Sequence, residues 1–159
     1  MKLSSINQKN EICLELKMCG YADDEDWFKE VRVSVEMKGQ HNNVQADFLA
    51  YLHDGKDDEV TDFVKGLHEL FESRQGKVEL HLEGMEQQDC DRRSITLSFY
   101  AIDSSGHIGL ALSVSGATRY SNTAEFPFCT TTSFEIDPSL VEEVAYTIEA
   151  LYEGVGRNA

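Results

Sequence analysis

The chain has 159 residues, with 29 acidic and 14 basic side chains that give a formal net charge of −15 at pH 7. Such a charge disfavours nucleic acids and anionic membrane surfaces as partners, and it favours basic proteins or cations. The length allows a substantial core, and the apolar fraction of 41% is well above that of a disordered chain. We therefore predict a single domain over residues 1–159 that binds neither nucleic acid nor membrane.

The N-terminal residues 1–16 contain no continuous apolar core of signal-peptide length. No run in the chain approaches the roughly 18 apolar residues that indicate a membrane span. The cysteines Cys13, Cys19, Cys90 and Cys129 form no CxxC pair and no metal-ligand spacing. These features predict a cytoplasmic protein without a disulfide framework, structural zinc or any other cofactor.

Alternating apolar and polar residues predict three strands in the first half of the chain. Residues 11–18, 27–38 and 44–52 each place an apolar side chain at every second position. The short polar connections between them favour an antiparallel meander. An amphipathic helix follows, with Asp57 or Asp58 as its cap. Its apolar stripe consists of Val60, Phe63, Val64, Leu67, Leu70 and Phe71.

The second half resumes the alternation, with three strands expected within residues 78–114 and a fourth within residues 125–136. Residues 116–124 are rich in small polar side chains and predict a loop. Pro127 predicts that the last strand begins at a sheet edge or a bulge.

A second amphipathic helix closes the chain. Asp137 is suited to cap it, and Pro138 suits its first position, where no backbone donor is needed. Its apolar stripe consists of Leu140, Val141, Val144, Ala145, Ile148, Leu151 and Tyr152. The order of elements, βββ-α-ββββ-α, predicts an α+β fold with about seven strands in a largely antiparallel sheet, braced by the two helices.

The two helices share one apolar template. Residues 60–72 align without a gap on residues 141–153, with apolar side chains at matching positions. One interpretation is an internal duplication with halves at about residues 11–76 and 77–154. The other is the general similarity of amphipathic helices.

The sequence contains no signature of catalysis, such as GxSxG, a P-loop, GxGxxG after a strand or HExxH. His53 lies near Asp54, Asp57 and Asp58, a set that suits a metal ion, but a capped helix start explains these acids more simply. The remaining histidines are dispersed. We predict no catalytic residues, no metal site and no enzyme activity.

Two acidic segments are the most suggestive surface features. One lies beside Tyr21 and Phe28, and the other precedes the first helix. Acidic side chains next to aromatic ones suit a surface that binds a basic protein, because charge attraction speeds association and buried rings hold the complex. The alternative is a solvated loop with the tryptophan in the core. The candidate partner-binding residues are Asp23, Asp24, Glu25, Asp26, Trp27, Asp54, Asp57 and Asp58.

Most of the chain, about residues 11–153, resembles the WapI-type immunity proteins of bacterial polymorphic toxin systems. The similarity rests on the order of elements and on the stretches DWFKEVRVSVEMKG, ADFLAYLHD and SFEIDPSLVEEVAYTIEAL. The resemblance implies a short acidic α+β protein that is encoded with a toxin and neutralises the toxin's C-terminal domain. A nuclease toxin would present a basic groove that an acidic surface can occupy.

Two other functions remain open from the sequence. One is a small ligand-binding or sensory domain with a pocket lined by Phe48, Tyr51, Phe99 and Tyr100. The other is a hydrolase or metal-dependent enzyme, which requires His and Asp side chains that converge in space. The sequence leaves the strand order, the toxin and the oligomeric state undetermined.

Overall fold

The structure is a computed structural model that describes most of the chain. The described residues are 1–21, 28–39, 43–53, 59–85, 92–121 and 124–154.

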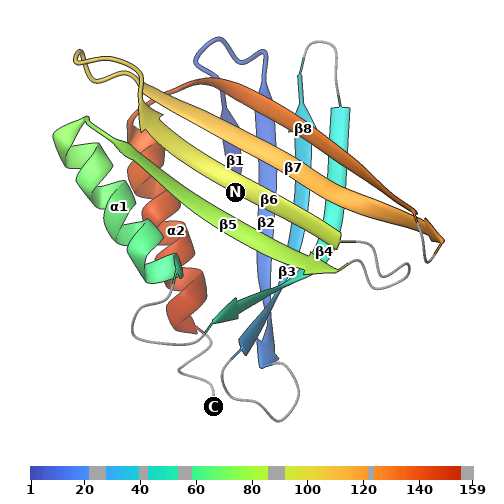
Figure 1. Ribbon diagram of the computed structural model, residues 1–159. Helices are drawn as coiled ribbons and strands as arrows, with labels where there is room; N and C mark the ends of the chain where they lie inside the picture. Colours follow the sequence, from blue (N-terminus) through green and yellow to red (C-terminus); the bar gives the residue numbers. More distant parts are fainter. Residues whose placement is uncertain (22–27, 40–42, 54–58, 86–91, 122–123, 155–159) are drawn as a thin grey trace.

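The described residues form one antiparallel sheet and two helices (Figure 1). The strands are β1 (Lys2–Ser4), β2 (Glu11–Tyr21), β3 (Phe28–Lys38), β4 (Asn43–His53), β5 (Lys77–Met85), β6 (Arg92–Ala101), β7 (Ile108–Ser121) and β8 (Ala124–Ile136). The helices are α1 (Glu59–Ser73) and α2 (Ser139–Gly154). Each strand pairs with the next one along the chain, in the order β1 to β8. The α+β class and the meander of the first half are confirmed.

The structure differs from the predicted elements in two places. Strand β1 is additional, and it pairs with β2 through Leu3 and Ile12, both of which are buried. Three residues are too few to give a periodic signal. The loop expected at residues 116–124 is largely strand, because β7 continues to Ser121 and β8 begins at Ala124. Pairing with β8 outweighs the turn signal of Gly116 and the small residues around it, and Thr118 and Tyr120 are themselves residue types favoured in strands.

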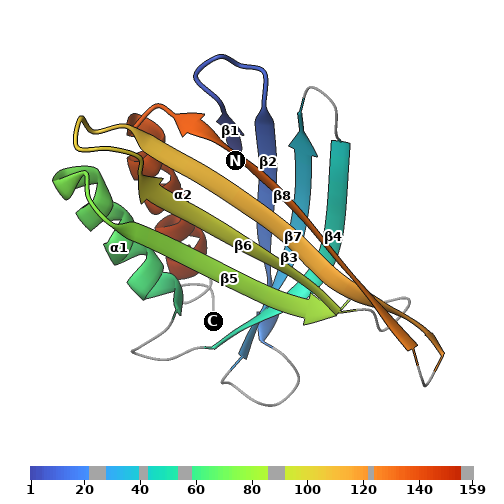
Figure 2. The same cartoon turned by 45° about the horizontal axis from the view of Figure 1, so that its top comes forward.

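The sheet curls so that its two halves face each other across a common core. In Figure 1, β5–β8 cross in front of β1–β4, and Figure 2 shows the same crossing from another direction. The edges also meet, since the backbone N–H of Ile6, just after β1, donates to the carbonyl of Glu135 in β8 at 3.1 Å. Strand residues buried between the halves include Leu14, Val33, Phe48, Leu82, Leu97, Phe99, Leu110 and Ile136.

The two helices lie side by side and cover one side of this curled sheet (Figures 1 and 2). Helix α1 packs on β5 and β6, while α2 packs on α1 and reaches β2. The predicted stripe of α1 is buried, apart from the half-buried Phe71. In α2 the stripe is buried at Val141, Val144, Ala145 and Ile148, whereas Leu151 is only half-buried.

Asp137 caps α2 as predicted, because its Oδ1 accepts the backbone N–H of Ser139 at 2.9 Å and its hydroxyl at 2.7 Å. These two hydrogen bonds lower the pKa of Asp137. The cap therefore fixes the corner at which β8 turns into α2.

The two halves share one order of elements, four strands followed by a helix. Val60, Val64 and Leu67 in α1 are buried, and so are Val141, Ala145 and Ile148, which align with them in α2. The single domain stays a prediction. The internal duplication, with halves at about residues 11–76 and 77–154, also stays a prediction, because a common order of elements does not require a common origin.

The halves join where β5 crosses β4. Among the described residues, these strands pair through Leu49 with Met85 and through Ala50 with Gly84. A Cβ atom on Gly84 would lie 2.6 Å from the carbonyl carbon of Leu49, 2.9 Å from the Cα of Ala50 and closer still to the Leu49 oxygen. Carbon atoms make favourable contact only at about 3.5–4.0 Å, so only glycine allows this approach.

We predict that Gly84→Ala lowers the free energy of unfolding by at least about 3 kcal/mol, because the obstacle is backbone that no rotamer change removes. Urea denaturation followed by circular dichroism measures the change. The adjacent, exposed Glu83→Ala is the control and should change stability by less than about 1 kcal/mol. Equal stability of the two variants would contradict the close approach.

Burial along α2 predicts unequal costs for two truncations one turn apart. Ile148→Ala removes a fully buried side chain and should cost about 2–5 kcal/mol. Leu151→Ala removes a half-buried one and should cost clearly less, about 1–2 kcal/mol. Urea melts of the two variants test the order, and a larger loss for Leu151→Ala would show that the helix faces the sheet differently.

Candidate functional site

The residues predicted to bind a partner all lie in segments outside the described residues. They are Asp23, Asp24, Glu25, Asp26, Trp27, Asp54, Asp57 and Asp58. The described strand residues on either side show where these segments attach.

Both acidic segments attach at one end of β2–β4. Tyr21, the last residue of β2, pairs with Lys29 of β3, and Phe28, the first residue of β3, pairs with His53, the last residue of β4. Helix α1 begins directly after the second segment, at Glu59. The sheet therefore brings the attachment points of the two segments to neighbouring strand ends, although they are far apart in the sequence.

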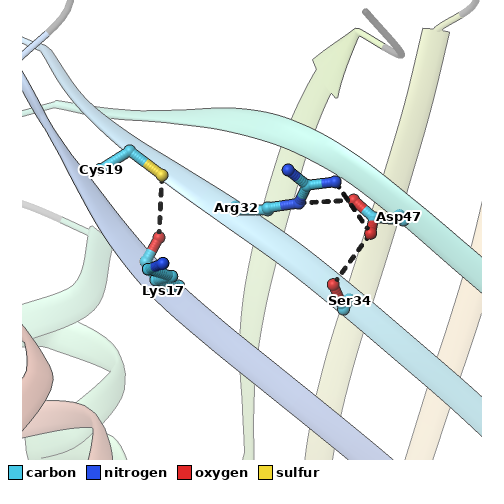
Figure 3. Close-up of polar contacts among 5 residues, drawn as sticks. All are labelled: Lys17, Cys19, Arg32, Ser34 and Asp47. Atoms are coloured by element: carbon cyan, nitrogen blue, oxygen red, sulfur yellow. Dashed lines mark hydrogen bonds and ion pairs between the residues drawn. The ribbon is translucent and has the colours of Figure 1, made fainter.

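The outer face of β2–β4 carries several charges that are paired with one another. Figure 3 shows Arg32 donating to both carboxylate oxygens of Asp47, at 3.0 and 3.2 Å, with Ser34 donating to the same carboxylate at 3.2 Å. Glu36 contacts Lys38 at 2.8 Å, and that hydrogen bond, followed by one from Gln45, lowers the pKa of Glu36.

A shallow groove of about 660 Å³ lies over this face. Cys13, Ser34, Gln45 and Asp47 are among the residues that line it. Burial, followed by the hydrogen bond to Glu11, raises the pKa of the Cys13 thiol, which makes it a poor nucleophile. The groove thus offers polar contacts but no activated group.

The outer face of β5–β8 consists largely of hydroxyl side chains that satisfy one another. Ser94 and Ser115 lie 2.7 Å apart, and Ser113 and Thr131 lie 2.8 Å apart. Two further hydroxyls have other partners on this face: Ser98 donates to the Glu79 carboxylate at 2.7 Å, and the Thr96 hydroxyl lies 2.9 Å from the His81 ring. Among the described hydroxyls of this face, none combines with both a histidine and an orienting acid as nucleophilic catalysis requires.

The outward faces of α1 and α2 are acidic, and most of their acids have no ion pair among the described residues. Lys65 is the one basic residue within the two helices, and among the described residues its 4.0 Å contact with Glu69 is the only ion pair there. The acids of the helices whose side chains are described are Glu59, Asp62, Glu69, Glu72, Glu142, Glu143 and Glu149. Sequence reasoning missed this surface, although the signal was present, since acids recur at positions off the apolar stripes of both helices.

The histidines with described side chains lie apart from one another. His68 contacts the ring of Tyr146, His81 bonds Thr96, and His107 lies 2.7 Å from Asp103 in the turn between β6 and β7. Within the described part of the chain, no three His, Cys, Asp or Glu side chains are grouped to hold a metal ion. Asp54, Asp57 and Asp58, which were considered together with His53 as possible metal ligands, lie outside the described residues.

The four aromatic residues suggested as a pocket lining do not lie together, so that expectation is wrong. Phe48 and Phe99 are buried in the core, whereas Tyr51 is exposed and Tyr100 covers Gly109 on the outer face. The reason is strand geometry, since residues separated by an odd number of positions point to opposite faces.

Comparison with protein-family models, curated proteins and solved structures finds no match for this chain. Among the described helices, none is both long enough and apolar enough to cross a membrane.

The contact between His107 and Asp103 predicts a measurable titration. The hydrogen bond raises the pKa of His107 above its ordinary 6.5 and lowers the pKa of Asp103 below its ordinary 3.8. The stabilising effect of the raised histidine pKa is complete below pH 6.5 and is lost as the pH rises through the folded-state value. The effect of the lowered aspartate pKa is present above pH 3.8 and is lost as the pH falls through its folded-state value.

We therefore expect the imidazole of His107 to titrate by NMR with a midpoint above 6.5, and Asp103→Asn to lower that midpoint. Asp62→Asn on α1 is the control, because Asp62 does not contact His107. An unchanged midpoint in Asp103→Asn would rule out the contact in solution.

Proposed function

We propose that this chain is a non-enzymatic, cytoplasmic immunity protein that binds and neutralises a cognate toxin domain, a basic nuclease. The similarity of its sequence stretches to WapI-type immunity proteins supports the proposal, as does the net charge of −15. The partner is a protein, and neither nucleic acid nor membrane binds to the acidic surface.

The attachment of the two acidic segments at one end of β2–β4 is the observation that carries the proposal. Tyr21, Phe28 and His53 lie at neighbouring strand ends, so residues 22–27 and 54–58 attach at the same end of β2–β4. Charges that are gathered at one place steer a basic partner more strongly than the same charges spread over the whole surface.

Inhibition is stoichiometric in this proposal. A nuclease holds its substrate through cationic side chains that contact phosphates, and carboxylates compete for the same side chains. The immunity protein occupies the nucleic-acid groove or an adjacent surface, and it needs no catalytic group. Because exposed charges contribute to the association rate, binding should slow as the ionic strength rises.

The test is to purify the protein with the toxin domain encoded beside it. We expect a one-to-one complex by size-exclusion chromatography with light scattering, and loss of nuclease activity as the ratio reaches equivalence. An unrelated basic nuclease is the control for charge attraction alone. The proposal fails if the protein neither binds its neighbouring toxin domain nor blocks its activity.

A further inference from the structure

We propose that the groove between α1 and α2 docks a basic, amphipathic helical segment of the partner protein. The proposal rests on the proposed function for the identity of the partner. It adds a second contact surface, formed by helices, to the acidic segments at the strand ends.

The groove lies between two packed helices and has a volume of about 430 Å³. Val60 and Val64 of α1 are buried at its base, and Tyr152 of α2 is half-buried beside them. Its walls are formed by Thr61, Lys65, His68, Glu69 and Glu72 of α1 and by Glu149 of α2. An apolar base with polar walls accepts apolar side chains and positions charged groups around them.

An exposed aromatic side chain stands next to this groove. Tyr146 of α2 is 57% exposed, and its ring contacts the ring of His68 edge to face, with centroids 5.5 Å apart. His68 itself lines the groove. Tyrosines held in one position on a rigid element are enriched among the residues that contribute most binding energy at interfaces. The ring contact holds Tyr146 in such a position.

Three acids and one basic residue, Lys65, line the groove, so its formal charge of −2 favours a cationic occupant. Glu72 and Glu149 line opposite walls, and neither has an ion pair among the described residues. Two acids of the outer β2–β4 face are different, since Asp47 is paired with Arg32 and Glu36 with Lys38. Unpaired carboxylates on facing helices repel one another, and Lys or Arg side chains of a partner relieve that repulsion.

The shape of the groove favours a helix as the occupant. Its lining follows α1 from Val60 to Glu72, which at 1.5 Å per residue spans about 18 Å, or roughly three helical turns. A partner helix lying in such a groove inserts its apolar side chains between the two helices. Its basic residues then meet the carboxylates on both walls.

A helical peptide tests the surface without the toxin. The probe is a synthetic peptide of about 18 residues built from Lys and Leu with a single Trp, long enough to form a helix in water. The ¹⁵N-labelled full chain is titrated with it, and Trp fluorescence gives the dissociation constant. We expect amide shift changes concentrated in α1 and α2.

The variants compare the groove with an equal charge change elsewhere. Glu72→Lys/Glu149→Lys and, separately, Tyr146→Ala should each weaken peptide binding at least about tenfold. Glu15→Lys/Glu83→Lys, at exposed positions of β2 and β5, makes the same change in net charge and should weaken binding less than about threefold. Circular dichroism verifies folding, and Glu72→Gln/Glu149→Gln replaces the lysine variant if that variant unfolds.

Equal loss in the groove and control variants overturns the proposal, because it would mean attraction to the net charge alone. Absence of peptide binding, or shift changes away from the helices, also overturns it. None of these outcomes bears on whether the protein neutralises a toxin, so the proposed function stands or falls separately. If the toxin domain binds the unmodified protein, it should bind the Glu72→Lys/Glu149→Lys variant more weakly. Equal binding to both would overturn the proposal that the groove is its docking site.

Discussion

The contact of two backbones at Gly84 is the constraint on which the rest of the structure depends. Strand β5 passes so close to Leu49 and Ala50 of β4 that no side chain fits between them. This approach joins the two halves of the chain into a single sheet, which then curls until the halves face each other. Leu14 and Val33 on one half and Leu97 and Leu110 on the other are buried together as a result.

The position of the helices follows from this curl. Helix α1 leaves the first half and α2 leaves the second, yet they pack against each other because both cover the same side of the sheet. Their apolar stripes are used in the core, so their acidic positions all face outwards. Several acids on the sheet have a basic neighbour, as Asp47 has Arg32 on the adjacent strand, whereas the helices contain only Lys65. Within the helices the acids therefore outnumber the basic residues, and one of the two acidic segments attaches directly before α1.

Periodic segments were predicted well because their burial follows from local pattern. The stripe of α1, the cap at Asp137 and the alternation in β2, β3 and β6 all appear in the structure as expected. Predictions were wrong where local pattern and tertiary pairing disagree. The small polar residues 116–121 belong to β7 because β8 pairs with them, and Leu3 belongs to a strand because β2 supplies its partner. The four aromatic residues suggested as a pocket lining were assigned without regard to strand parity, which places Phe48 and Tyr51 on opposite faces.

The sequence by itself determined the α+β class, the order of most elements, the excess of acid and the absence of known catalytic signatures. These properties depend on composition and on patterns within about ten residues, where period and capping act. Only the tertiary structure decided that β4 meets β5, that β1 and β8 approach each other and that the two helices form one acidic groove. Each of these depends on contacts between residues far apart in the chain. Glu72 and Glu149 are neighbours only because the curled sheet brings α1 and α2 together.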